Sequence, residues 1–297
     1  MFRVLYESTA GQIEFGGGDS KIANLTELSG IGIPDRKYNT IDYTGQPGQK
    51  TTDRKDSARI ITLAGDLYGG QTELENFLDI VYADGTLYFE FDTQKRRIPC
   101  KFYAMSDVKR SAGCDVIPFA VQFIADYPYF LDYEDVVAYV FRLEDLWPNL
   151  KGSKNKPIVS LTTVDSGMAT RRIKELEFEM GGIRGVYPTL YIENLSESTS
   201  STTWTVTVTL SESDGTERAV IELPDRVYPG ETIKFDLKHR QIESTRSGDI
   251  TNTITDRTFL SDFILKPGYN KITLTCQTSD TLSAWVVYSP EYISTEW

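Results

Sequence analysis

Histidine and cysteine are scarce in this chain. Its 297 residues include one histidine, His239, and three cysteines, Cys100, Cys114 and Cys276, with no CxxC spacing. Zinc sites and disulfide frameworks need clusters or pairs of these residues. A serine or cysteine triad would have to use His239, and no Gly-x-Ser-x-Gly elbow marks a nucleophile. The sequence therefore predicts no catalytic residue, no metal site and no cofactor, and we expect His239 to be an exposed residue at a strand end.

Long apolar runs and an excess of positive charge are also missing. The longest apolar run, Val136 to Phe141, has six residues, whereas a membrane-spanning helix needs roughly 20. The N-terminal residues lack the apolar core and cleavage site of a secretory signal. The net charge of −12 disfavours a surface that holds nucleic acid phosphates or anionic lipid. We expect no membrane insertion and no specific binding of DNA.

Aromatic and turn-forming residues, by contrast, are plentiful. Aromatic residues make up 12% of the chain, with 17 Tyr and 14 Phe, and they favour strands and contacts between subunits. Glycine and proline break up the first sixty residues, which we interpret as a β-rich opening with a long loop. A chain of this length is long enough for two cores. The composition predicts a mainly β protein of two domains.

One helix is expected in the first half. Thr72 and Glu75 form a capping box, and Asp84-Gly85 ends the helix. Three turns are too few to be stable alone in water, so the apolar stripe must pack on a sheet. That stripe, at helical spacing, consists of Leu74, Phe77, Leu78 and Val81. Strands are expected at Arg59–Leu63, Leu87–Phe91, Ile98–Tyr103 and Val116–Ile124, with residues 92–97 as a hairpin turn.

The second half has the rhythm of an antiparallel β-sandwich. Residues from Thr203 to Leu210 alternate between threonines and apolar residues, so one face of this strand should cover a core. A polar, breaker-rich stretch between Glu144 and Pro157 is typical of a linker. We place the boundary a little before it, which gives domains of residues 1–135 and 136–297. Turns are expected at Asp214-Gly215, Pro229-Gly230 and Pro267-Gly268.

Several short motifs have ordinary structural explanations. Gly16-Gly17-Gly18 lacks the following Gly-Lys-Ser/Thr of a P-loop and predicts a turn. The acids Asp132, Glu134 and Asp135 lack the spacing of a calcium loop, and we expect a solvated charged stretch. Lys95-Arg96-Arg97 should form a solvated hairpin tip or an inter-subunit ion pair. Trp204 is expected in the core, whereas Trp285 stays open as a sugar-binding platform.

A series of short motifs runs through the first 135 residues. In order, they are Gly30-Ile31-Gly32-Ile33-Pro34, Gly45-Gln46-Pro47-Gly48, Arg59-Ile60-Ile61-Thr62-Leu63-Ala64-Gly65, the helix, Gly85-Thr86-Leu87-Tyr88-Phe89, Arg97-Ile98-Pro99-Cys100, and Gln122 to Phe130. In this order and spacing the segment resembles the phage distal tail protein family, often called Dit. In the second half, Pro267-Gly268-Tyr269-Asn270 resembles a turn into a late strand of the same family, whereas residues 136–186 match it poorly.

The resemblance implies an architecture and a role. It implies an N-terminal β-sandwich with a helix and a hairpin, whose six copies close into a ring that continues the tail tube, and a C-terminal galectin-like β-sandwich. The implied role is structural and not enzymatic: a hub ring at the tail tip of a phage or phage-like particle, which joins the tube to the baseplate or host-recognition apparatus and lets DNA pass. The galectin sugar-site pattern is absent, because His239 is followed by Arg240-Gln241.

The resemblance also implies partners and contacts. Its partners would be further copies of itself, the tail tube protein, the tape measure protein and a tail-associated fibre or lysin protein. Its place would be the virion tail tip, after assembly in the reducing cytoplasm of a host bacterium. The negative charge suggests an acidic lumen that repels DNA. Candidate contacts between subunits are Leu87, Tyr88, Phe89, Phe91, Arg96, Arg97, Tyr127, Tyr129 and Phe130.

Two other functions stay open on the sequence alone. The first is a carbohydrate-binding or adhesin module that recognises a cell-surface glycan through loops and exposed aromatic residues. The second is a wall hydrolase that uses a pair of carboxylates, whose separation is a three-dimensional quantity that the sequence does not give.

Overall fold

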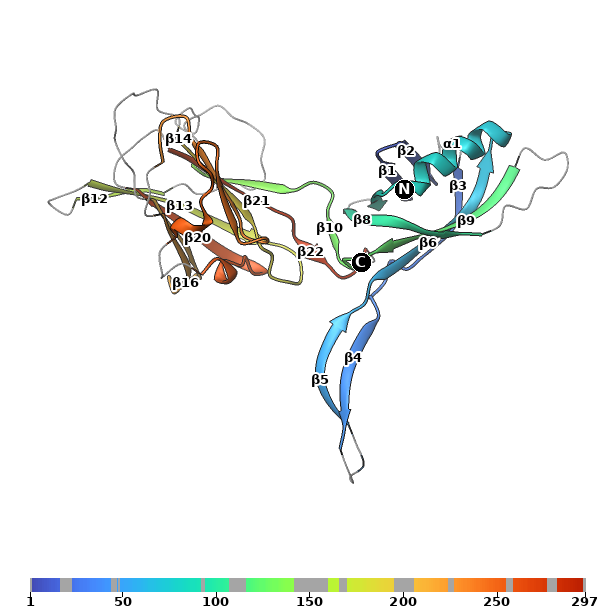
Figure 1. Ribbon diagram of the computed structural model, residues 1–297, viewed down its shortest axis with the longest axis horizontal. Coiled ribbons are helices and arrows are strands. Elements are labelled where there is room, and N and C mark those ends of the chain that lie inside the picture. The colour runs from blue at the N-terminus through green and yellow to red at the C-terminus, as the bar shows by residue number, and fades with distance from the viewer. Residues whose placement is uncertain are drawn as a thin grey trace. The chain divides into compact units, whose positions relative to one another are not determined.

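The computed structural model describes most of the chain and divides it into two units (Figure 1). Unit 1 comprises residues 1–133 and 292–297, and unit 2 comprises residues 134–291. We expected a single boundary near residue 135. The structure has a boundary close to that position and assigns residues 292–297 to unit 1 as well. The described residues are 2–16, 23–43, 47, 49–91, 94–106, 116–141, 160–165, 170–194, 206–223, 227–254, 259–276 and 282–295.

Unit 1 is built on a closed β-barrel. Strand β8 pairs with β7 on one side and β9 on the other, and this second pairing closes the strand order β8-β7-β1-β2-β3-β6-β9. The expected N-terminal sandwich is therefore a barrel, a closure that removes the free edges of these strands. Strands β10 and β22 extend the sheet beyond β8. The bounds are β1 Phe2–Ser8, β2 Gly11–Phe15, β3 Ala23–Ser29, β6 Arg59–Tyr68, β7 Gly85–Phe91, β8 Gln94–Met105, β9 Val116–Ala125, β10 Phe130–Asp132 and β22 Glu291–Tyr292.

The barrel strands follow the two-residue period of a half-buried sheet. In β6, Ile61, Leu63 and Leu67 are fully buried, while Thr62, Ala64 and Asp66, which alternate with the buried positions, are more exposed. Alternate side chains point to opposite faces of a strand, so this pattern places one face in the core. The other strands add aromatic rings to that core, among them Tyr6 and Phe123, whose centroids lie 4.6 Å apart. The expected strands in this half are confirmed, and each is longer than the sequence indicated.

Helix α1, Gly70–Tyr82, packs on the barrel through the expected apolar stripe. Phe77 is buried between Phe15 and Phe119, with ring centroids 6.2 and 5.0 Å away. The capping box was wrong: the helix begins at Gly70, so Thr72 lies inside the first turn, and no side chain caps the start. The N-cap residue is Gly69, whose φ of 113° favours glycine. Leu78 is 37% exposed, so the stripe is narrower than its spacing predicted.

The basic cluster Lys95-Arg96-Arg97 lies in strand β8, which corrects its placement in a hairpin turn. Arg97 pairs with Tyr88 and Lys95 with Glu90 across the β7–β8 ladder. Only residues 92 and 93, outside the described part of the chain, lie between β7 and β8 in the sequence. The three side chains therefore stand on the side of a strand and not at a loop tip.

Unit 2 contains two antiparallel sheets that share one core. The core takes buried residues from both sheets, for example Ile192 and Phe235 from one and Leu210 and Leu274 from the other. The first sheet has the order β11 (Val136–Phe141), β21 (Leu282–Tyr288), β14 (Thr189–Asn194), β17 (Thr232–Asp236), β18 (Gln241–Ser244) and β19 (Gly248–Asp249). The second has the order β12 (Ser160–Asp165), β13 (Thr170–Met180), β20 (Gly268–Cys276), β15 (Val206–Ser211) and β16 (Glu217–Leu223).

The turn chemistry of unit 2 agrees with the sequence. Gly215, Gly230 and Gly268 all have positive φ, as the three expected turns require. Asn270 is fully buried, and its amide donates to the carbonyl oxygens of Lys266, at 2.7 Å, and Gly268, at 3.0 Å. This side chain therefore fixes the turn that leads into β20. Trp204 and the linker expected between residues 144 and 157 lie outside the described residues.

Unit 2 also contains two short 3-10 helices, Thr251–Thr253 and Leu260–Asp262. Within the described ranges, no helix has the length and apolar character that a membrane span requires.

Burial makes Cys100 a testable marker of unit 1. Burial raises the pKa of this thiol to about 12, so at pH 8 only about one molecule in ten thousand carries the reactive thiolate. We expect Cys100 in the native protein to resist iodoacetamide at pH 8 and to react readily in urea, as measured by mass spectrometry of its peptide. Equal rates in the two conditions would contradict the buried position.

Candidate functional site

A two-stranded arm is the most distinctive surface feature of unit 1. Among the described strands, β4, Arg36–Asp42, and β5, Gln49–Asp56, pair only with each other and form a sheet of their own. Figure 1 draws this hairpin apart from the barrel. The sequence had been interpreted here as a long loop. At about 3.3 Å per residue, each strand spans about 25 Å.

The arm has no covered face. Every described residue of β4 is exposed, and all of β5 except the half-buried Asp56. Tyr38 is 55% exposed on one side of the ladder, and Ile41, 60% exposed, lies on the other. A two-stranded hairpin is marginally stable at best in water. Apolar side chains on both faces therefore need a surface that this chain does not provide within its described residues.

The base of the arm is held by Arg59, the first residue of β6. Its guanidinium donates to the backbone carbonyl oxygens of Gly30, at 2.8 Å, and of Gly32, next to the arm. It also donates to Pro128, at 2.9 Å, and to Ile293, at 2.7 Å. One side chain thus joins the segment that leads into the arm, the segment that leads into β10 and the segment that returns to unit 1.

Arg59 is a buried charge held mainly by backbone dipoles. The residue is 4% exposed, and its guanidinium lies 4.6 Å from the centroid of the Phe130 ring. Burial lowers the pKa of Arg59 to about 10, so the side chain still carries its charge at neutral pH. A buried charge is tolerated when hydrogen bonds replace its water, and carbonyl oxygens together with an aromatic face do so here.

Gly30 allows the arm to leave the barrel at this point. Its φ is 82°, and a Cβ atom there would lie 2.0 Å from the carbonyl oxygen of Ile60 in β6. Any side chain would collide with backbone, so only glycine fits. The motif Gly30-Ile31-Gly32 is therefore explained by packing: it brings two carbonyl oxygens within reach of Arg59.

Asp56 closes the base of the arm from the other side. Its carboxylate accepts a hydrogen bond from the hydroxyl group of Tyr129, and it lies 3.0 Å from Arg36 Nε. The backbone N–H of Ser57 donates to the carbonyl oxygen of Asp35 at 2.7 Å. The two ends of the arm are therefore adjacent, and the arm leaves and re-enters the barrel at one place.

The structure separates the nine predicted contact residues into two groups. Leu87, Phe89, Phe130 and Tyr129 are buried in unit 1, where they fill its core or, for Tyr129, hold Asp56. Burial in the chain's own unit leaves these four no free surface to present to a neighbour. The residues with exposed surface are Tyr88, Phe91, Arg96, Arg97 and Tyr127.

Arg96 binds within its own unit. Its Nη1 lies 2.9 Å from the Asp132 carboxylate, and its guanidinium stacks 3.6 Å from the Tyr292 ring centroid. Burial raises the pKa of Asp132, and Arg96 opposes that rise. Asp132 is thus part of an ion pair, which corrects the expectation of a solvated residue there. Glu134 and Asp135 are exposed, as expected. This cluster links β8, β10 and the returning C-terminal strand β22.

The described residues lack a metal-ligand cluster, and the one histidine of the chain lies at a strand end. They contain no group of three or more histidine, cysteine, aspartate or glutamate side chains that could hold a metal ion. His239 follows β17 and is exposed, as expected, with its ring Nδ1 2.9 Å from Asp236.

Comparisons with known proteins show the fold. The structure of the SPP1 Dit protein aligns with 98% of this chain and 99% of its own, with a TM-score of 0.62 and 13% sequence identity. SPP1 Dit is described as a paradigm of the hub adsorption apparatus in phages that infect Gram-positive bacteria. A chain from the activated phage P2 baseplate with calcium aligns over 94% and 98%, at a TM-score of 0.49 and 9% identity.

The likeness to Dit proteins that the motif order indicated is therefore confirmed at the level of the fold. No family model matches the sequence, and no curated protein matches it significantly. The arm, by contrast, was missed. Its sequence signal was the set of β-branched residues around Gly45-Gln46-Pro47-Gly48, which is typical of a hairpin. Thr40, Ile41 and Thr44 precede these four residues, and Thr51 and Thr52 follow them.

Arg59→Met tests the hydrogen bonds that the Arg59 guanidinium makes at the base of the arm. Methionine keeps an apolar stem but leaves buried carbonyl oxygens without donors, which should cost about 3 kcal/mol or more. We expect calorimetry to show unit 1 melting at least about 10 °C lower, and hydrogen exchange to become faster in residues 293–295. The control is Arg54→Met on the exposed arm, where little change is expected. An equal fall in melting temperature in both variants would show that Arg59 has no special role in the stability of unit 1.

Proposed function

We propose that this chain is a structural hub protein of a phage or phage-like tail tip, six copies of which form a ring between the tail tube and the baseplate or host-recognition apparatus. The observation that carries the proposal is the bare arm on a barrel of the Dit fold. The proposed role is assembly and not catalysis.

The arm supports the proposed self-association because its apolar side chains have no covering surface among the described residues. Tyr38, Ile41 and Tyr43 expose apolar surface that an isolated hairpin leaves in water. Packing this surface on another molecule would remove it from water at about 25 cal/mol per Å². The free edges of β4 and β5 could in addition pair with strands of a neighbour.

The charge of the arm favours a second copy of the same chain. Residues 36–56 contain five basic and three acidic residues, whereas the whole chain has a net charge of −12. A basic arm is attracted to the acidic remainder of another copy. Each copy offers both halves of this contact, which is the requirement for head-to-tail association. A head-to-tail contact that closes by rotation makes a ring.

The remaining parts of the proposal follow from the same fold. The half-buried Tyr88, Phe91 and Arg97 and the exposed Tyr127 are proposed to extend the arm contact, because permanent interfaces typically bury roughly 2,000 Å² or more. Unit 2 is proposed to be a galectin-like sandwich. The proposed neighbours are the tail tube protein, the tape measure protein and a fibre or lysin protein. An acidic lumen would let DNA pass without binding it.

Removal of the arm tests the ring. Because Asp35 and Ser57 are hydrogen-bonded neighbours, residues 36–56 can be replaced by a short Gly-Ser link without moving the barrel strands. We expect the full chain to have the mass of a hexamer, or a multiple of one, by light scattering, and the shortened chain to be a folded monomer. An unchanged melting temperature of unit 1 would show that the barrel survives the deletion.

A point variant refines the same measurement. Tyr38→Ser with Ile41→Ser should weaken association, since it removes apolar surface from both faces of the arm. Tyr68→Ser with Tyr103→Ser is the matched control, because these residues are also exposed in unit 1 but lie on the barrel. A wild-type chain that stays monomeric at all concentrations, or an armless chain that keeps the full mass, would overturn the proposed ring.

A further inference from the structure

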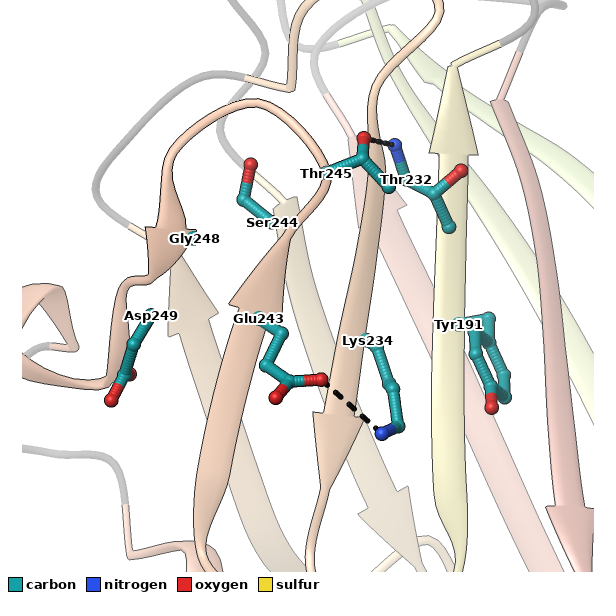
Figure 2. A pocket seen from close by; sticks show the side chains of 8 residues that line it. All are labelled: Tyr191, Thr232, Lys234, Glu243, Ser244, Thr245, Gly248 and Asp249. Carbon is teal, nitrogen blue, oxygen red and sulfur yellow. Dashed lines mark hydrogen bonds and ion pairs between the residues drawn. The ribbon is translucent and has the colours of Figure 1, made fainter.

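The six-stranded sheet of unit 2 carries a pocket on its outer side (Figure 2). The pocket has a volume of about 370 Å³, and Tyr191, Thr232, Lys234, Glu243 and Asp249 contribute to its walls. This volume lies near the lower end of the range for ligand pockets, roughly 300–1,000 Å³. All of these residues belong to strands of one sheet, so a rigid framework holds the pocket.

Strand register brings the four main side chains into one row. Tyr191 of β14 lies opposite Lys234 of β17, Lys234 lies opposite Glu243 of β18, and Glu243 lies opposite Asp249 of β19. Directly opposed residues project to the same face of a sheet. The strand neighbours of these residues fill the core on the other face, and they include the buried Ile192, Ile233 and Ile242. The row is therefore the polar, outward face of the sheet.

Tyr191 forms a fixed aromatic wall. Its ring is stacked on that of Trp285, on the neighbouring strand β21, with centroids 5.1 Å apart and planes 8° from parallel. Trp285 therefore covers one face of Tyr191 and limits its rotation. Tyr191 borders the pocket, so the ring offers a flat apolar surface beside charged groups. Such a combination suits a ligand with one apolar side and many hydroxyl groups.

Lys234 and Glu243 supply polar groups that a ligand could engage. Their Nζ and Oε2 atoms are 3.2 Å apart, and their side chains are 36% and 45% exposed. An exposed ion pair contributes little to stability, typically about 1 kcal/mol or less. Its ammonium can therefore donate to a ligand hydroxyl, and its carboxylate can accept from one, at small cost to the fold. Thr232 adds a hydroxyl, and its backbone N–H is bonded to Thr245 at the rim (Figure 2).

We propose that this pocket binds a neutral saccharide, as a mono- or disaccharide unit, with the sugar ring packed on Tyr191 and its hydroxyls bound by Lys234, Glu243 and Asp249. One cation and two carboxylates line the pocket, and this balance disfavours sugars that carry carboxylate or phosphate groups. The pocket belongs to unit 2 alone, so the proposal does not depend on formation of the ring.

Titration of the full-length protein with defined sugars tests the proposal. The probes are glucose, galactose, N-acetylglucosamine and rhamnose, with glucuronic acid as the anionic comparison. Trp285 is in contact with Tyr191, so tryptophan fluorescence and saturation-transfer NMR should both report occupancy. We expect saturable binding of at least one neutral sugar, with a dissociation constant on the order of 1 mM, and no binding of glucuronic acid.

Matched variants locate the binding. Tyr191→Ala and Glu243→Gln should each weaken it about tenfold or more, as expected for the loss of an aromatic wall or a charged hydrogen bond. The controls are Tyr187→Ala, a tyrosine of unit 2 that does not line the pocket, and Glu212→Gln, from an exposed pair with Lys266 that also spans 3.2 Å. Both controls should bind like the wild type, and Glu243→Gln keeps the test valid if Tyr191→Ala does not fold.

Three results would overturn the proposal. The first is the absence of saturable binding of every neutral probe up to a concentration of about 100 mM, well above the expected dissociation constant. The second is binding that Tyr191→Ala and Glu243→Gln weaken no more than their controls do. The third is a preference for glucuronic acid. The light-scattering mass of the same samples is measured separately, so a failure here leaves the proposed ring standing, and the reverse also holds.

Discussion

The buried guanidinium of Arg59 is the constraint on which unit 1 depends. It donates hydrogen bonds to backbone carbonyl oxygens in three parts of the chain, at Gly30 and Gly32, at Pro128 and at Ile293. A buried charge that loses its water needs all of its donors used in good geometry, or it destabilises the fold. The planar fork of arginine meets several carbonyls at once, which lysine does not. The barrel, the arm and the C-terminal segment are therefore fixed together.

This constraint divides unit 1 into a stable body and an incomplete surface. The barrel is closed, and a core of aromatic rings and the helix fills it. The arm is anchored at its base by Asp56 and Arg59 but has no core of its own. A firm anchor combined with uncovered apolar faces is the arrangement expected of a segment that completes its packing on a neighbour. The proposed ring is the simplest assembly that gives every arm such a surface.

The sequence predicted what depends on local pattern and failed where distant strands meet. Alternation of apolar and polar residues located β6 and β15, and turn glycines located the starts of β16 and β20. Both signals lie within a few residues of the chain. The barrel closes because β8 pairs with β9 as well as with β7, and a local sequence pattern does not show which distant strands pair. The arm resembled a loop because both of its faces are exposed, so its strands show no apolar alternation. The pocket of unit 2 arises from the register of four strands. Its lining residues carry no sequence signal, and only Trp285, which stacks on Tyr191 outside the lining, was a sequence-based candidate for sugar binding.

The return of residues 292–297 to unit 1 has a mechanical consequence. Unit 2 is joined to unit 1 by two covalent connections, and these continue into β10 and β22, which are neighbours in one sheet. A force that pulls on unit 2 is therefore shared between two adjacent strands. Arg59 holds the chain beside both, at Pro128 and Ile293. Two covalent connections therefore carry a load applied to unit 2, and neither has to carry it alone.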